Sequence, residues 1–307
     1  IVVVEIGLGA QADGLPDLVD AEFVRDNTPR VPADAHKGTR KSVGIVAGGV
    51  NMGGSAILAA LGALRGGAGL VKVVTASPNI SAVHCRLPEA LAAPLEDATA
   101  AVTGWADAVL IGPGLGRDDQ MKWFIRETLR TWRGAVVVDA DALNAFGSDL
   151  AELGEALHGR PALITPHPGE MALLTGRDVR YVLQSRFDIG LEVARKIGAT
   201  VLLKGTPTVV SSPDGARYVV ATGTPVLATG GSGDALGGMI ATLLAQGCTP
   251  SVAACCAAWV HGRAAELTAG VRGYRLMDVL DRLPQAWSLR AIAPSRYPVL
   301  ATLPALS

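Results

Sequence analysis

Short, continuous apolar runs recur along the chain and separate segments of a different pattern. A strand of a parallel sheet is covered on both faces, so its hydrophobicity is continuous rather than alternating. The runs therefore predict strands of a mostly parallel sheet. They lie at residues 42–49, 70–76, 108–112, 135–140, 162–165 and 200–204.

Between these runs lie helical patterns, at residues 55–66, 119–132, 169–175 and 182–197. Strands that alternate with helices predict an α/β fold of three layers, α/β/α, with helices on both faces of the central sheet. After residue 204 the pattern changes to a small β-meander, in which Pro213-Asp214-Gly215 joins strands at 208–212 and 217–220. Further helices are predicted at 235–246, 251–269 and 276–282.

The two ends of the chain have a different composition from the middle. Residues 1–6 predict a short strand, and residues 9–34 read as a loop with several prolines. From residue 284 onward the chain carries four prolines and little charge, which predicts a loosely docked or disordered extension. We therefore expect an upstream remnant with its linker over 1–35, one main domain over 36–285, and a tail over 286–307.

Composition narrows the class of protein. The chain has 307 residues, of which 49% are hydrophobic and 18% charged, as expected for a globular α/β protein with a large core. Its net charge is −1 and it has no run of Lys or Arg, so neither a nucleic-acid nor an anionic-membrane partner is expected. No 18-residue apolar span is present, which argues against a membrane span, and the start does not look like a signal peptide.

The cysteines have neither metal-ligand spacing nor the pattern of a disulfide framework. We expect them to be buried free thiols in a protein of the reducing cytoplasm. They are Cys85, Cys248, Cys255 and Cys256.

A glycine-rich turn is the strongest candidate for chemistry. Gly230, Gly231, Ser232 and Gly233 come directly before Asp234, and an apolar helical pattern follows. Such a turn aims free backbone N–H groups and the positive end of the helix dipole at an anion, so it predicts a phosphate site. Asp234 is then either a simple helix cap or the base that takes a proton from a hydroxyl attacking the phosphoryl group. The turn is neither a P-loop nor a dinucleotide fingerprint.

Other glycine-rich or polar segments also follow the predicted strands. Because ligands bind beyond the carboxyl ends of parallel strands, we expect these loops to form a single cleft with the glycine turn. The segments are 48–55, 112–117, 139–144, 165–170 and 204–206.

Several residues in these loops have both a structural and a functional interpretation. Asp139 and Asp141 can cap a helix or shape a turn, or one of them can hold a magnesium-bound water near phosphates. His167, between two prolines and beside Glu170, predicts a ligand contact. Lys204 can reach the surface or contact a nucleotide phosphate. The remaining histidines are predicted to be structural or on the surface, without a zinc site: His36, His84, His158 and His261.

Taken in order, these motifs resemble the carboxyl-terminal domain of the bifunctional NAD(P)H-hydrate repair enzymes, the ADP/ATP-dependent NAD(P)HX dehydratases of the ribokinase-like fold. The resemblance covers residues 36–285, and residues 1–8 are similar to the end of the epimerase domain that precedes this domain in bifunctional members. The motifs are His-Lys-Gly at 36, Gly-Gly-Ser-Ala at 53, Gly-Pro-Gly-Leu-Gly-Arg at 112, Val-Asp-Ala-Asp-Ala-Leu-Asn at 138, Thr-Pro-His-Pro-Gly-Glu at 165, Leu-Lys-Gly at 203 and Gly-Gly-Ser-Gly-Asp at 230.

The resemblance implies two ligands, NADHX or NADPHX as substrate and ADP or ATP as phosphoryl donor, with Mg²⁺ carried by the nucleotide rather than by protein ligands. It also implies a homo-oligomer with an epimerase domain in the same natural chain, and ADP is favoured as donor. The implied substrate-binding residues are Ala56, Gly114, Gly116, Asn144, His167 and Asp234. The implied nucleotide-binding residues are Lys204, Gly205, Thr206, Pro207, Thr208, Gly230, Gly231, Ser232 and Gly233.

The implied reaction is a nucleotide-dependent dehydration, so the enzyme would be a hydro-lyase. Asp234 would deprotonate the C6 hydroxyl of the hydrate, and this hydroxyl would attack the terminal phosphoryl group. Loss of phosphate would restore NADH or NADPH and leave AMP or ADP. Three alternatives remain at this point: a kinase of the same fold for a sugar, hydroxymethylpyrimidine or thiazole alcohol, an NAD-dependent dehydrogenase, which the missing Gly-x-Gly-x-x-Gly disfavours, and a regulatory nucleotide-binding module without catalysis.

Overall fold

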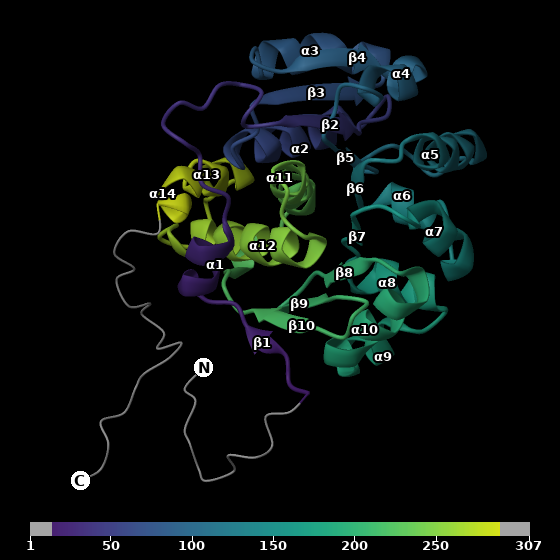
Figure 1. The fold of residues 1–307 in the computed structure, drawn as a ribbon, viewed down its shortest axis with the longest axis vertical. Coiled ribbons are helices and arrows are strands. Elements are labelled where there is room, and N and C mark those ends of the chain that lie inside the picture. The colour runs from purple at the N-terminus through teal and green to yellow at the C-terminus, as the bar shows by residue number, and fades with distance from the viewer. Residues whose placement is uncertain (1–13, 289–307) are drawn as a thin grey trace.

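The central element of the fold is a ten-stranded sheet (Figure 1), seen here in a computed structural model that describes residues 14–288. Its strand order is β1-β10-β9-β8-β7-β6-β5-β2-β3-β4. The strands are β1 (Asp17–Leu18), β2 (Ser42–Val46), β3 (Leu70–Thr75), β4 (Leu91–Pro94), β5 (Ala108–Ile111), β6 (Ala135–Val138), β7 (Ala162–Ile164), β8 (Thr200–Leu203), β9 (Thr208–Ser211) and β10 (Arg217–Val220).

Seven neighbouring strands, from β4 to β8 in the spatial order, are parallel, as the continuous apolar runs predict. In β2 and β5 the residues from Val43 and Ala108 onward are almost completely buried, because helices cover both faces of the sheet. The predicted meander is also confirmed, since β9 pairs antiparallel with both β8 and β10. The mostly parallel three-layer architecture is therefore correct.

Helices form the two outer layers (Figure 1). Buried residues of α2, α11 and α12 share one core with Ile45, Leu110 and Leu202 of the sheet, and those of α5, α7, α8 and α10 share a second core with the alternate strand residues. The helices are α1 (Ala21–Asn27), α2 (Gly53–Arg65), α3 (Ile80–Arg86), α4 (Ala98–Val102), α5 (Asp119–Thr131), α6 (Asp141–Asn144), α7 (Leu150–Leu157), α8 (Pro168–Thr175), α9 (Val179–Gln184), α10 (Arg186–Ile197), α11 (Ser232–Ala245), α12 (Pro250–Glu266), α13 (Leu276–Leu280) and α14 (Leu283–Trp287).

Helices α2 and α11 pack with their backbones unusually close. A Cβ at Gly62 would lie 2.0 Å from the carbonyl oxygen of Ala235, and a Cβ at Gly238 would lie 1.9 Å from that of Ala59. Only glycine permits such an approach, so these two residues fix α11 against α2. The contact holds in place the N-terminus of α11, which begins at the glycine turn.

Three predictions near the ends and in the middle of the chain need correction. The loop predicted over 9–34 contains β1 and α1, where Asp20 caps the helix and Val24 is fully buried. The tail begins with an ordered helix, α14, whose Ala286 is 3% exposed. The helix predicted over 182–197 is two helices, because Ser185 leaves helical geometry between α9 and α10. The strand predicted over 1–6 and the tail beyond 288 lie outside the described residues.

The expectation of buried thiols holds for only part of the cysteines. Cys255 and Cys256 are buried in α12, Cys248 is half-buried, and Cys85 is exposed on α3. All of them are free.

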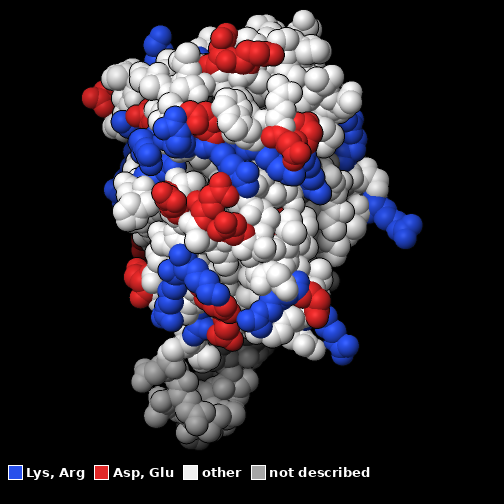
Figure 2. Space-filling view, turned by 90° about the vertical axis from the view of Figure 1, so that its right-hand side faces the viewer, with Lys and Arg blue, Asp and Glu red and all other residues white. Residues whose placement is uncertain are grey.

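Within residues 14–288, no helix combines the length and apolar character needed to cross a membrane. On the face shown in Figure 2, Lys and Arg side chains are interspersed with Asp and Glu rather than gathered into one basic patch.

Candidate active site

The loops that follow the parallel strands gather at the carboxyl edge of the sheet, but they line two cavities rather than the single cleft predicted. The first, here the Lys204 cavity, measures about 510 Å³ and is lined by residues of the 204–208 loop, the 222–233 segment and α12. The second, here the Trp123 cavity, measures about 640 Å³ and is lined by residues of the 49–52 and 114–118 loops together with Trp123 and Asp141.

The glycine turn forms the N-terminus of α11 at the Lys204 cavity. Gly231 has φ +87°, which suits glycine, and it starts the helix without any side-chain cap. Gly230, Ser232 and Gly233 line the cavity, so the positive end of a 14-residue helix faces it. A Cβ on Gly233 would lie only 3.2 Å from Nζ of Lys204. Helix dipole and lysine therefore converge on one anion-binding position.

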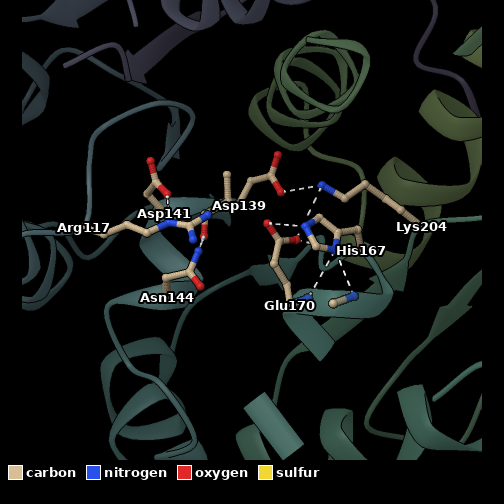
Figure 3. Close-up of polar contacts among 9 residues, drawn as sticks. Arg117, Asp139, Asp141, Asn144, His167, Glu170 and Lys204 are labelled. Atoms are coloured by element: carbon tan, nitrogen blue, oxygen red, sulfur yellow. Dashed lines mark hydrogen bonds and ion pairs between the residues drawn. The ribbon is translucent and has the colours of Figure 1, made fainter. Parts of the chain in front are cut away.

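Lys204 belongs to a buried cluster of charges (Figure 3). Its Nζ lies 2.8 Å from Oδ1 of Asp139 and 3.9 Å from Oε2 of Glu170. Burial lowers the pKa of Lys204, but the two carboxylates outweigh it and the net shift is upward. Burial raises the pKa of Glu170, against the opposing effect of Lys204. Lys204 therefore keeps its positive charge at the floor of the site.

Asp234 does not itself line either cavity, but residues close to it line both. Burial raises its pKa to about 6, a hydrogen bond from the Ser55 hydroxyl opposes the shift, and the charge of Asp139 adds to it. Gly233, just before Asp234, lines the Lys204 cavity. Ser55 packs against Gly114, where a Cβ would lie 3.0 Å from Cβ of Ser55, and Gly114 lines the Trp123 cavity. A half-buried carboxylate with a pKa near 6 is suited to act as a general base.

The two aspartates after β6 make contacts on opposite sides of the site (Figure 3). Asp139 pairs with Lys204, whereas Asp141 accepts hydrogen bonds from the backbone N–H of Gly116 at 3.0 Å and from Nε of Arg117 at 2.7 Å. Between them Ala140 has φ 51° and ψ −119°, a strained conformation for a residue with a Cβ. The helix-cap interpretation left open for the two carboxylates is thus not the arrangement found, because neither side chain caps α6.

His167 caps α8 with its side chain. Its Nδ1 accepts hydrogen bonds from the backbone N–H groups of Gly169 and Glu170, at 2.9 and 3.2 Å. Its own backbone N–H donates to Oε2 of Glu170 at 2.8 Å, which completes a capping box. The imidazole is half exposed and lines the Lys204 cavity. Since Nδ1 accepts, the proton of the neutral imidazole is on Nε2, which lies 3.3 Å from Oε1 of Glu170.

Most of the residues predicted to bind the nucleotide line the Lys204 cavity. Two residues of that predicted group, Pro207 and Gly231, do not. Pro207 accepts a hydrogen bond from Arg186 through its carbonyl, and Gly231 packs against Leu58. The residues that do line it are Lys204, Gly205, Thr206, Thr208, Gly230, Ser232 and Gly233.

The predicted substrate set is divided between the cavities. Gly114 and Gly116 line the Trp123 cavity, and His167 lines the Lys204 cavity. Ala56 is fully buried and lines neither cavity. The amide of Asn144 donates to the carbonyl of Ala140 at 3.2 Å and so supports the strained turn.

Several contributors were not foreseen from the sequence. Ser55 reaches Asp234, and Arg186 of α10 holds the 204–207 loop by donating to the carbonyls of Lys204 and Pro207. Of the two alternatives left open for His261, structural or on the surface, the structure supports the structural one, since the residue is 3% exposed and lines the Lys204 cavity. The glycine that follows it in the sequence, Gly262, indicates close packing at this point, because a Cβ there would meet the carbonyl oxygen of Thr222 at 2.5 Å.

The sheet order, the glycine turn and the aspartate at the start of α11 define a ribokinase-like α/β protein. Over 89% of this chain and 96% of the other, the fold matches a ribokinase-like superfamily protein of Enterococcus faecalis, with a TM-score of 0.77 and 25% identity. It also matches the crystal structure of the ADP/ATP-dependent NAD(P)H-hydrate dehydratase of Bacillus subtilis co-crystallized with ATP and Mg²⁺. That match has a TM-score of 0.80 and 32% identity, over 90% of this chain and 99% of that one.

Within that class, the family model described as NAD(P)H-hydrate dehydratase matches residues 43–285. The bifunctional NAD(P)H-hydrate repair enzyme Nnr of Moorella thermoacetica is 40% identical over 283 residues, which make up 87% of this chain and 53% of that protein. The chain therefore belongs to the NAD(P)H-hydrate dehydratase family, and it spans about half the length of the curated relatives it matches.

Proposed function

We propose that this chain catalyses the nucleotide-dependent dehydration of the hydrated nicotinamide of NADHX or NADPHX, with ADP or ATP as phosphoryl donor. Membership of the dehydratase family supports the reaction type. The observation that carries the proposal is the position of Asp234, directly after an uncapped glycine turn at the Lys204 cavity and in contact with Ser55, which packs against Gly114 of the Trp123 cavity. This arrangement offers one place for a phosphoryl donor, one for a second ligand and a base between them.

The nucleotide is assigned to the Lys204 cavity, with its terminal phosphoryl group over Gly230–Gly233. There the N–H groups of α11 and the ammonium group of Lys204 would stabilise the charge on the transferred phosphoryl oxygens. The hydrated nicotinamide is assigned to the side of Asp234 that faces Ser55 and Gly114. The Trp123 cavity continues from Gly114 and offers room for the rest of a dinucleotide.

In the first step Asp234 takes the proton of the C6 hydroxyl, and the oxygen forms a bond to the terminal phosphorus while the bond to AMP or ADP breaks. In the second step the C6–O bond breaks and phosphate leaves, helped by the lone pair of the ring nitrogen. Loss of a proton from C5 then forms the C5–C6 double bond. The balance is one hydrate and one ADP converted into one NAD(P)H, one AMP, one phosphate and one proton.

The residues present fit a magnesium ion carried by the nucleotide. The carboxylates of Asp139, Glu170 and Asp234 surround a single lysine; burial is the main cause of the raised pKa of Glu170 and Asp234, and the charge of Asp139 adds to both. Asp139 and Glu170 would hold such an ion through its water ligands, and it would neutralise charge on the phosphates. Among residues 14–288 no group of three or more His, Cys, Asp or Glu side chains forms a protein-only metal site.

Three further properties belong to the proposal. The curated relatives are bifunctional repair enzymes, which supports an epimerase domain in the same natural chain, preceding the domain over 36–285. We also expect a homo-oligomer, and a cytoplasmic location where NADH and NADPH are formed. A kinase of the same fold remains the competing function, because it needs the same glycine turn and base.

The two functions differ in their products. Enzymatically hydrated NADH is incubated with the protein and either ADP or ATP, while absorbance of the reduced nicotinamide and free phosphate are followed. A dehydratase restores absorbance and releases one phosphate for each NADH formed. A kinase would leave a stable phosphorylated product with no gain in absorbance, and that result would overturn the proposal.

A further inference from the structure

The loop that follows β8, over residues 204–208, is held from outside the Lys204 cavity by one arginine. Arg186 is the first residue of α10, is 8% exposed and does not line the cavity. Gly205 does line it, and a Cβ on Gly205 would lie 2.4 to 2.8 Å from Nη1, Nη2 and Cζ of Arg186. The guanidinium therefore packs against the loop without entering the cavity, and only glycine leaves room for it.

The hydrogen bonds that the Arg186 side chain makes within residues 14–288 all go to this loop. Nη1 donates to the carbonyl of Pro207 at 2.8 Å and to that of Lys204 at 3.4 Å. Burial lowers the pKa of Arg186, and no carboxylate among the described residues pairs with it. Burying a cation without an acidic partner costs free energy, so the place of this arginine calls for an explanation.

One planar group fixes both ends of the loop. The carbonyls that Arg186 binds belong to Lys204, directly after β8, and to Pro207, directly before β9. The two residues between them line the cavity. The shape of the cavity wall at this point therefore depends on the geometry of a guanidinium group, which a lysine does not reproduce.

A different residue orients the charged end of Lys204. Its Nζ pairs with Oδ1 of Asp139 at 2.8 Å, whereas its backbone carbonyl accepts from Arg186. Loss of Arg186 would free the loop and leave the ion pair that keeps the ammonium group at the floor of the site. The position of the loop and the position of the charge can therefore be changed separately.

We propose that Arg186 is a positioning residue for the phosphoryl donor, because it holds the loop over 204–208 in the conformation that receives the nucleotide. The inference rests on the proposed function only for the placement of the nucleotide in the Lys204 cavity. Arg186 touches neither the nucleotide nor the reacting atoms. Its loss should therefore raise KM for the nucleotide and leave turnover at saturating nucleotide almost unchanged.

The test compares two buried arginines in the whole chain. Calorimetry measures the affinity for ADP, and steady-state rates with hydrated NADH give KM and kcat, for the wild type, Arg186→Ala, Arg186→Lys and the control Arg160→Ala. Within residues 14–288 the partly buried guanidinium of Arg160 also donates only to backbone carbonyls, none of which belongs to the lining of the Lys204 cavity. They are those of Leu129, Trp132 and Ala156.

We expect Arg186→Ala to weaken ADP binding about tenfold, the scale of a lost hydrogen bond from a charged group, with kcat within about twofold of the wild type. Arg186→Lys keeps the charge but not the planar fork, and should still weaken ADP binding at least about threefold. Arg160→Ala should lose stability in thermal unfolding and keep its ADP affinity. All affinities are measured at a temperature where each protein is folded.

Chemical rescue distinguishes positioning from a general structural role. Guanidinium ion at about 20 mM, far below the molar concentrations that unfold proteins, should occupy the space left in Arg186→Ala and restore most of its ADP affinity. The same addition should not change ADP binding by the wild type or by Arg160→Ala. If the alanine variant does not fold, Arg186→Lys decides the question, because it fills most of the same space.

Several results would overturn the inference. Unchanged ADP affinity in folded Arg186→Ala would remove the positioning role, and wild-type affinity in Arg186→Lys would show that charge alone suffices. An equal loss of ADP affinity in Arg160→Ala would reduce the effect to general destabilisation. A fall in kcat with KM unchanged would move Arg186 from nucleotide binding to the chemical step.

The outcomes for Arg186 and for the proposed function are separable. A wild type that binds ADP but restores no NADH would contradict the dehydratase, and the ADP affinities of the variants would still decide the role of Arg186. A wild type that binds neither ADP nor ATP would contradict both.

Discussion

Two glycine-rich segments border the active site, and they are rich in glycine for different reasons. In the loop over 112–116, a Cβ on Gly112 would lie 1.8 Å from the carbonyl oxygen of Asp139, and one on Gly114 would lie 2.8 Å from Cβ of Met52. In the turn over 230–233, a Cβ on Gly230 would have no atom within 4 Å. At Gly112 and Gly114 other parts of the protein fill the space, whereas a Cβ on Gly116 would meet only Oδ2 of Asp118, at 3.9 Å.

The second segment lacks side chains although much of the space is open. On Gly233 the nearest group is the flexible end of Lys204, at 3.2 Å. Gly231 is the exception, because a Cβ there would lie 2.2 Å from Leu58. Gly112 and Gly114 thus belong to the packed scaffold, whereas Gly230 and Gly233 leave space beside the Lys204 cavity. Substitutions in the two segments should therefore affect different properties.

The largest effect is expected on stability, from Gly112→Ala. Its Cβ would clash with the backbone of Asp139, and φ +131° is a region that alanine avoids. Overpacking and backbone strain together predict a loss of about 4 kcal/mol in the free energy of unfolding. Denaturant titration measures it. The matched control is Gly147→Ala, which also has positive φ but open space, and which should lose only about 1 kcal/mol.

The next effect is on turnover, from Asp234→Asn. Loss of the general base should lower kcat at least about a hundredfold while ADP still binds, because the glycine turn and Lys204 are unchanged. Steady-state rates and calorimetry on the same preparation measure both quantities. Near-normal turnover in this variant would remove Asp234 from the mechanism and leave it as a helix-terminal acid.

The pKa of Asp234 also predicts a pH dependence. Because its folded-state pKa of about 6 lies above the ordinary value of 3.8, the folded protein binds more protons between these values and its stability falls as pH rises through them. The free energy of unfolding is therefore compared between Asp234→Asn and the wild type at two pH values. The difference, variant minus wild type, should be about 2 kcal/mol larger at pH 7.5 than at pH 4. For activity the sign is opposite, since the ionised base is needed and kcat/KM should fall below about pH 6.

The smallest effect is expected from Gly230→Ala. A methyl group there meets open space, so the free energy of unfolding should change by less than about 0.5 kcal/mol. The same methyl group would point into the Lys204 cavity, and ADP binding should weaken about tenfold. A destabilised variant with normal nucleotide affinity would place Gly230 with Gly112 and remove the distinction between the two segments.

The sequence was most informative where the physical signal is local. Continuous apolar runs predicted the parallel strands, and a proline-aspartate-glycine turn predicted the hairpin of β9 and β10. Elements as short as β4 and α6 have too few residues to show a period, and α1 was obscured by the prolines around it. Helix α14 was missed because its burial against α12 depends on the tertiary fold, which composition does not report.

The site was predictable to a similar extent. Residue type and order along the chain predicted that Lys204 and the glycine turn lie together, which the structure shows, and the chemistry assigned to Asp234 stays a prediction. The contacts of Ser55 and Arg186 depend on segments far apart in the sequence and carry no local pattern. For His261 the sequence left a structural and a surface position open, and only the packed structure shows that it is buried in a cavity wall.

The oxygen of the substrate hydroxyl tests the central claim most directly. NADH hydrated in H₂¹⁸O carries the label at C6, and the phosphate released during its repair with ADP can be analysed by mass spectrometry. If the hydroxyl deprotonated by Asp234 attacks the terminal phosphoryl group over Gly230–Gly233, one ¹⁸O atom appears in each phosphate formed. Unlabelled phosphate, with the ¹⁸O recovered in water, would show that nucleotide cleavage and dehydration are separate events and would contradict this account.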